Sequence, residues 1–168
     1  MKKAAKKKVS PIPKGYSVLT THLSIKGAAQ AIDFYAKAFG AKTRLRMDGP
    51  GGTIGHAELM IGSSVFMIAD EFPGSGASSP ATLNGTTASF YLYVKDVDAA
   101  FARALAAGAT QLMPPMDMFY GDRIGSLKDP FGHVWSLATH IEDVQPKEMA
   151  RRSKEMMEKM ASGKPPSA

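Results

Sequence analysis

The sequence predicts an α+β fold in which a strand, a helix and three further strands occur twice in succession. Two segments carry apolar residues at three- and four-residue spacing and end at glycine, and short β-branched or alternating segments surround both. The halves can be laid over each other, with Ile25 on Val94 and Gly40 on Gly108. We therefore expect two βαβββ modules in one domain, each a curved mixed sheet, around a shared cavity.

The first module is expected within residues 17–70. Its first strand, at 17–25, is rich in β-branched side chains, and its helix, at 27–39, ends at Gly40. Gly62-Ser63 suits a tight hairpin between the last two strands. The three later strands are expected at 42–47, 54–61 and 64–69.

The second module is expected within residues 87–140, after a loop at 72–85 that is rich in Gly, Ser and Pro. A strand at 87–94 precedes a helix at 97–107, which Gly108 ends. The later strands are expected at 110–113, ending at Pro114-Pro115, and at 120–128 and 133–140.

The two modules form a single predicted domain over residues 16–142, between two different ends. Residues 1–15 read as a disordered basic tail, and 143–168 as a helix with a frayed tail. Pro146 can begin this helix, and Met149, Met156 and Met160 lie on roughly one of its faces.

Composition excludes several classes of protein. The 168 residues are 44% hydrophobic and 21% charged, which is typical of a soluble globular chain with a core. The absence of cysteine excludes a disulfide scaffold, a thiolate metal site and a cysteine nucleophile, and it fits a cytoplasmic location. No apolar run approaches the roughly 20 residues of a spanning helix, so we expect no membrane partner.

Charge is concentrated at the N-terminus. Subtracting the five lysines among residues 2–8 from the formal net charge of +6 leaves +1 for the rest of the chain. A basic arm could bind nucleic acid or an anionic surface. No aromatic residue or arginine is interleaved with these lysines, which favours a solubilising tail instead.

Four segments resemble the vicinal oxygen chelate superfamily, which includes glyoxalase I, bleomycin-resistance proteins and extradiol dioxygenases. They are 31–35 (AIDFY), 56–59 (HAEL), 93–99 (YVKDVDA) and 129–140 (DPFGHVWSLATH). A fifth, 119–123 (FYGDR), is similar to the PhnB-like branch. The resemblance spans about residues 16–142 and implies a glyoxalase-like fold. It implies no single reaction, because this fold hosts isomerases, dioxygenases and pure binding proteins.

The resemblance also implies where metal ligands would stand. Aligned on the shared segments, the four positions hold Thr20, Met67, Ser89 and Ser136. A catalytic divalent ion needs about three strong nitrogen or oxygen ligands, and these side chains do not supply them. The chain departs from metal-dependent members here, and we expect neither a metal at these positions nor a cofactor.

A displaced metal site is the alternative. His22 shares a strand face with Thr20, and His56 and Glu58 alternate with apolar Ala57 and Leu59, so all three could face the cavity. They would come from one module. The other interpretation makes His22 a structural residue and the remaining pair a polar cavity wall. His56 and Glu58 are also our candidates for a catalytic acid or base.

Strand parity predicts further cavity residues in the second module. Tyr91 and Tyr93 share the face of Ser89, and Tyr120 shares that of Asp122. Arg123 takes the opposite face, where we expect it to pair with Asp129 or Asp96. The predicted ligand-binding set is His22, His56, Glu58, Tyr91, Tyr93, Tyr120, Asp122 and Ser136.

Three functions are compatible with these residues. The favoured one is metal-independent binding of a small molecule in the cavity, in the manner of the bleomycin-resistance members. The second is a metal-dependent lyase, isomerase or dioxygenase that uses a displaced site. The third, ranked last, is a basic-tailed protein that docks on nucleic acid or on a partner. We also expect a homodimer, because a single unit leaves sheet edges that pairing would cover.

Overall fold

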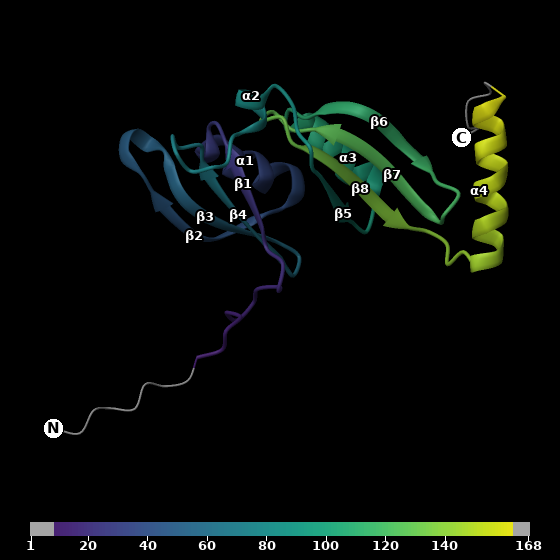
Figure 1. The fold of residues 1–168 in the computed structure, drawn as a ribbon, viewed down its shortest axis with the longest axis horizontal. Helices are drawn as coiled ribbons and strands as arrows, with labels where there is room; N and C mark the ends of the chain where they lie inside the picture. The colour runs from purple at the N-terminus through teal and green to yellow at the C-terminus, as the bar shows by residue number, and fades with distance from the viewer. Residues whose placement is uncertain (1–8, 163–168) are drawn as a thin grey trace.

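The computed structural model describes residues 9–162 and has an α+β architecture. Two four-stranded mixed sheets lie side by side, with strand orders β1-β4-β3-β2 and β5-β8-β7-β6 (Figure 1). Strand β1 is parallel to β4 and β5 is parallel to β8, and the other neighbouring strands are antiparallel. The two predicted βαβββ modules are therefore confirmed. The lysines of residues 2–8 lie outside the described residues.

The first module follows the predicted order. Gly27, in the left-handed conformation at φ 92°, precedes α1, and Gly40, at φ 69°, ends it. Asp70 accepts the backbone N–H groups of Gly27 and Ala28 at the helix start. The elements are β1 (Thr21–Ile25), α1 (Ala28–Phe39), β2 (Lys42–Asp48), the 3₁₀ turn η1 (Pro50–Gly52), β3 (Ile54–Ile61) and β4 (Ser64–Asp70).

The first strand is shorter than predicted. The expectation of a strand from residue 17 is wrong, because β1 begins at Thr21, which pairs with Phe66 on β4. Residues 17–20 have no neighbouring strand among the described residues, although their composition suits one. Val18 and Leu19 there are 90% and 87% exposed, so this stretch presents apolar side chains to solvent.

The second module repeats the first after the 72–85 loop, which contains one short helix. Asp96 caps α3 by accepting the backbone N–H of Ala99. The elements are α2 (Pro80–Leu83), β5 (Ser89–Tyr93), α3 (Val97–Ala106), β6 (Thr110–Asp117), β7 (Asp122–Lys128) and β8 (Val134–His140).

Strand β6 corrects the prediction that Pro114-Pro115 ends a strand. The strand continues through both prolines to Asp117, with irregular register between Met113 and Met116. It forms the outer edge of its sheet, where a residue without an N–H donor is tolerated. A proline pair therefore ends a central strand but not this edge strand.

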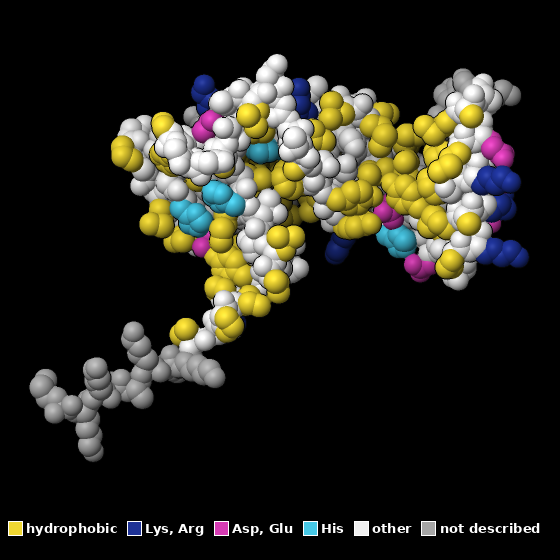
Figure 2. Space-filling model, viewed as in Figure 1, with side chains coloured by type: hydrophobic (Ala, Val, Ile, Leu, Met, Phe, Trp, Pro, Cys, Tyr) yellow, Lys and Arg dark blue, Asp and Glu magenta, His cyan; other side chains and the backbone are white. Residues whose placement is uncertain are grey.

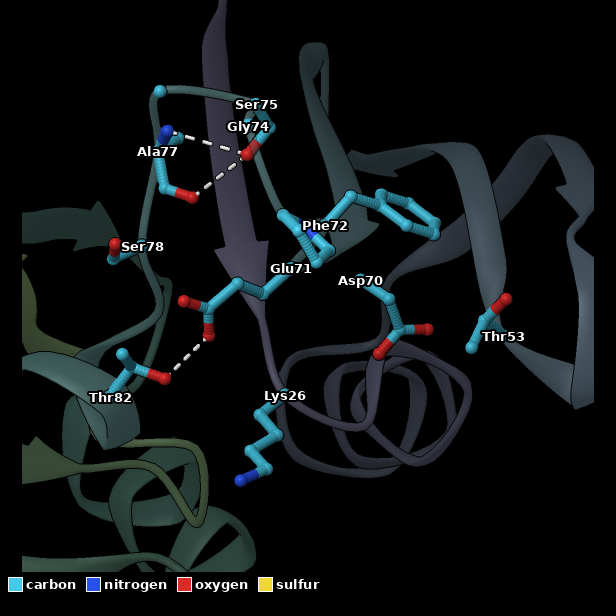
Figure 3. Close-up of a pocket in the computed structure, with 12 residues that line it drawn as sticks. Lys26, Thr53, Asp70, Glu71, Phe72, Gly74, Ser75, Ala77, Ser78 and Thr82 are labelled. Atoms are coloured by element: carbon cyan, nitrogen blue, oxygen red, sulfur yellow. Dashed lines mark hydrogen bonds between the residues drawn. The ribbon is translucent and has the colours of Figure 1, made fainter.

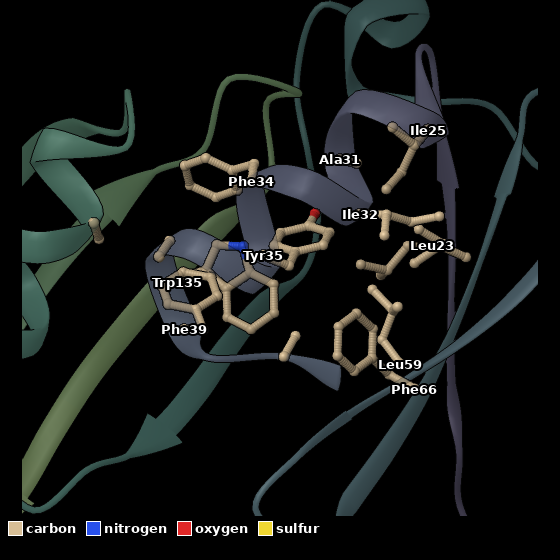
Figure 4. Close-up of a cluster of buried hydrophobic side chains, with 14 of the residues drawn as sticks. Leu23, Ile25, Ala31, Ile32, Phe34, Tyr35, Phe39, Leu59, Phe66 and Trp135 are labelled. Atoms are coloured by element: carbon tan, nitrogen blue, oxygen red, sulfur yellow. The ribbon is translucent and has the colours of Figure 1, made fainter. Parts of the chain in front are cut away.

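One aromatic core joins the two modules on the helix side of the sheets. Figure 4 shows Tyr35 and Phe39 of α1 beside Trp135 of β8, and the ring centroids of Phe39 and Trp135 are 4.6 Å apart. Asp129, 2% exposed, accepts hydrogen bonds from the Tyr35 hydroxyl at 2.8 Å and from Trp135 Nε1 at 3.0 Å. Helix α1 also packs against α3, so the modules share one interior.

The C-terminal helix α4 (Pro146–Ala161) stands at the end of the second module and has no buried residue (Figure 1). Arg152 holds it by pairing with Glu142 and donating to the Phe119 carbonyl. In Figure 2, hydrophobic side chains gather where the helix adjoins the module. Among residues 9–162, no helix has both the length and the apolar character needed to span a membrane.

Candidate functional site

Each sheet has a face that the helices do not cover, and the predicted site residues lie on these open faces or at their edge. On β3, Ala57 and Leu59 are buried toward the helix layer, at 0% and 1% exposure, which leaves His56 and Glu58 on the other side. The sheet register then sets Met67 of β4 beside both His22 and Glu58. The strand parity predicted for β3 is confirmed.

The first group consists of His22, His56 and Glu58 on the open face of the first sheet. The two imidazole rings are stacked with centroids 6.3 Å apart, and His56 Nε2 lies 3.7 Å from Glu58 Oε1. Burial and the neighbouring His56 lower the pKa of His22, which favours its neutral form.

Tyr16, which sequence reasoning missed, belongs to the same group. Its ring lies under the Arg44 guanidinium, 5.1 Å from the ring centroid. The Glu58 carboxylate raises the pKa of its phenol. The only sequence signal was an aromatic residue between the basic tail and the first strand.

The second group centres on Asp122, which is 4% exposed. Its Oδ2 accepts the hydroxyls of Tyr91 at 3.0 Å and Tyr93 at 2.9 Å, and its Oδ1 lies 2.7 Å from His140 Nδ1. Desolvation acts to raise the pKa of Asp122, but these hydrogen bonds outweigh it, and the net pKa is lowered. Asp122 is therefore an anionic centre that fixes three side chains.

Tyr91 and Tyr93 share one face of β5, as strand parity predicted, whereas Tyr120 is not on a strand. Tyr120 lies in the turn before β7, so the expectation that the strand begins at residue 120 is wrong, and β7 begins at Asp122. Tyr120 still lies near Tyr91, since burial and then the neighbouring Tyr120 and Asp122 raise the pKa of Tyr91.

His140 is a second residue of the candidate site, after Tyr16, that the predicted set omitted. The sequence signal for His140 was its shared strand face with Ser136, because alternate residues of one strand lie on the same face.

The prediction for Arg123 was wrong: its guanidinium pairs with Asp98 and Asp117 instead of Asp129 or Asp96. Helix α3 packs on the sheet and places Asp98 beside Arg123. The sequence pattern could not show how the helix lies on the sheet.

The four positions aligned with metal ligands are occupied in other ways. The Thr20 hydroxyl donates to the Ser17 carbonyl at 3.1 Å, and the Ser136 and Ser126 hydroxyls share a hydrogen bond of 3.1 Å. Met67 offers only a thioether, and Ser89 begins β5. Within residues 9–162, no three His, Asp or Glu side chains are arranged to hold a metal ion, and this includes the proposed displaced set.

The two groups are separate within one chain. Across the described part of the chain, no hydrogen bond, ion pair or ring contact joins His22, His56 or Glu58 to the Asp122 group. Each group thus presents its own surface on its own sheet.

A hollow of about 600 Å³ lies elsewhere, under the 71–78 loop (Figure 3). Its carboxylates are already engaged: Glu71 accepts from the Ser79 and Thr82 hydroxyls, and Asp70 accepts backbone N–H groups. These carboxylates hold the loop in place through hydrogen bonds to the protein itself, so we place the candidate site on the open faces.

Comparisons with known proteins agree with the fold described above. The family model described as Glyoxalase/Bleomycin resistance protein/Dioxygenase superfamily matches residues 18–137. An uncharacterised protein of Mycobacterium bovis is 45% identical over 129 residues, which covers 75% of this chain and 85% of that protein. An uncharacterised protein of Arabidopsis thaliana is 32% identical over 118 residues, covering 64% of this chain and 69% of the other.

Solved structures are similar over the same region. TioX from Micromonospora sp. ML1 matches with a TM-score of 0.60 and 29% identity, covering 74% of this chain and 99% of that one. A PhnB protein from Bacillus cereus matches with a TM-score of 0.55 and 25% identity, covering 73% and 99%. Since the family model spans most of the chain, the protein belongs to the glyoxalase/bleomycin resistance protein/dioxygenase superfamily.

Proposed function

We propose that this protein binds a small molecule on its open sheet faces without a metal ion. The observation that carries the proposal is that Thr20, Met67, Ser89 and Ser136 occupy the positions to which the resemblance assigns metal ligands. Two hydroxyls there are hydrogen-bonded within the protein. The faces instead offer aromatic rings, imidazoles and carboxylates, which suit an organic ligand. The absence of cysteine supports a cytoplasmic location.

The test separates ligand binding from metal binding. The full chain, dialysed against a chelator, should contain far less than one transition-metal ion per chain by elemental analysis. In a thermal-shift screen of small organic molecules, this stripped protein should still be stabilised by its ligands. Adding back zinc, nickel, manganese or ferrous iron should leave those shifts unchanged. Ligand shifts that appear only with an added metal would contradict the proposal.

We further propose that two copies associate and cover the open faces. Several large apolar side chains are exposed, among them Leu19 before β1, Tyr93 on β5 and Met157 on α4, at 87%, 62% and 67% exposure. Association would remove such side chains from water, which favours a dimer.

Light scattering at micromolar concentration should give twice the chain mass of 17.9 kDa. Leu19→Asp should shift the population toward the monomer, whereas Leu112→Asp, on the outer edge strand β6, should leave the dimer intact. A monomeric wild-type protein, or equal effects of the two variants, would count against this association.

A further inference from the structure

His140 is held between two carboxylates. Its Nδ1 lies 2.7 Å from Asp122 Oδ1, and its Nε2 lies 3.0 Å from Asp143 Oδ1. A neutral imidazole has one N–H, so both nitrogens donate only when the ring is a cation. The two carboxylates raise the pKa of His140, consistent with this geometry.

The two carboxylates are not equivalent. Asp122 is buried within the sheet and accepts two tyrosine hydroxyls besides the imidazole. The Asp143 side chain is 97% exposed, in the irregular segment between β8 and α4, and His140 is its one hydrogen-bond partner within residues 9–162. An exposed ion pair contributes about 0–1 kcal/mol, so another anion can readily replace Asp143.

A fixed aromatic wall adjoins this cation. Tyr91 and Tyr93 have ring centroids 5.1 Å apart and are 47% and 62% exposed. Both hydroxyls and His140 Nδ1 bond to the same carboxylate, which keeps the rings and the imidazole within the span of one small molecule. Because the hydroxyls are already engaged, the wall offers ring faces to a ligand.

We propose that the open face of the second sheet binds a small aromatic carboxylate. Its carboxylate takes the place of Asp143 at His140 Nε2, and its ring lies against Tyr91 and Tyr93. Asp143 then acts as an internal competitor that occupies the cation while the site is empty. This inference rests on the proposed small-molecule function and names the ligand class for one of its two faces.

Calorimetric titration of the full chain with 2-naphthoate and with its uncharged analogue, 2-naphthamide, tests the inference. The wild type should bind the carboxylate and not the amide. Asp143→Asn should bind 2-naphthoate about two- to fivefold more tightly, as loss of an exposed ion pair implies. His140→Gln should weaken it at least tenfold. Asp48→Asn removes the same charge on β2, far along the chain, and should leave the affinity unchanged.

An NMR readout avoids dependence on one variant. Imidazole signals of His140 should shift on addition of 2-naphthoate, while those of His22 and His56 stay in place. Equal binding of both probes, an unchanged affinity in Asp143→Asn, or no binding of 2-naphthoate at millimolar concentration would overturn the inference. If the carboxylate inference fails but the metal-stripped protein still binds uncharged molecules in the thermal-shift screen, the proposed small-molecule function stands. If the inference fails and the stripped protein binds no small molecule, the proposed function is wrong as well.

Discussion

Replacement of Leu59 by alanine is expected to lower the free energy of unfolding by about 2–5 kcal/mol, because it leaves a cavity in a packed interior. Leu59 is 1% exposed on the helix side of β3. His56→Ala, three residues earlier on the open face, should cost less than about 1 kcal/mol, since the His56 side chain is 30% exposed. Urea denaturation of the two variants and the wild type measures both values.

The comparison within one strand is what makes this experiment decisive. Both changes truncate a β3 side chain to the same methyl group, so backbone effects on the strand are matched. Equal destabilisation by the two variants would identify His56 as a structural residue and would remove the open face of the first sheet from the candidate site.

Asp129→Ala is expected to be comparably severe, at about 3–5 kcal/mol. This carboxylate accepts from the Tyr35 hydroxyl, Trp135 Nε1 and the backbone N–H groups of Phe131 and His133. Removing it leaves several donors without partners in the interior, and each unpaired group costs about 1–3 kcal/mol. Since Tyr35 belongs to the first module and Asp129 to the second, the variant also loosens the junction between them.

Denaturation followed by the fluorescence of Trp135, the single tryptophan, reports directly on this junction. Asp48→Ala provides the control, because the Asp48 side chain is 64% exposed and its ion pair within residues 9–162 is with Arg46 alone. Its cost should stay within about 1 kcal/mol. A similar small loss for Asp129→Ala would mean that the buried donors find other partners and that the junction does not depend on this carboxylate.

Local signals predicted the modules well where neighbouring residues decide the structure. Gly27 and Gly40 mark the two ends of α1 because each adopts a left-handed backbone conformation. The alternation of residues along β3 predicted which of its side chains are buried. Strand ends were less predictable, because a strand exists only beside a partner. Residues 17–20 have strand-like composition but no partner strand in the part of the chain that the structure describes, and Pro114-Pro115 continue a strand that lies at an edge.

For the candidate site, the sequence predicted which sheet face each side chain lies on but not which partners it contacts. Parity placed Tyr91, Tyr93 and Asp122 on one surface, and the structure joins them by hydrogen bonds. The role of Asp143 depends on how the segment after β8 turns back toward His140, and no periodicity encodes that turn. The partners of Arg123 likewise depend on how α3 crosses the sheet.

The proline pair in β6 has a consequence for how copies of this chain can assemble. Pro114 and Pro115 lack N–H groups and lie where the register is irregular, so the row of donors along that outer edge is interrupted for an extended segment of another molecule. The opposite outer edge, β2, carries Lys42, Arg44 and Arg46, whose like charges oppose pairing with a second β2. With both outer edges unsuited to strand addition, the association proposed above would use the open faces, which it would cover. A pair closed in this way would leave no free face from which open-ended fibres could grow.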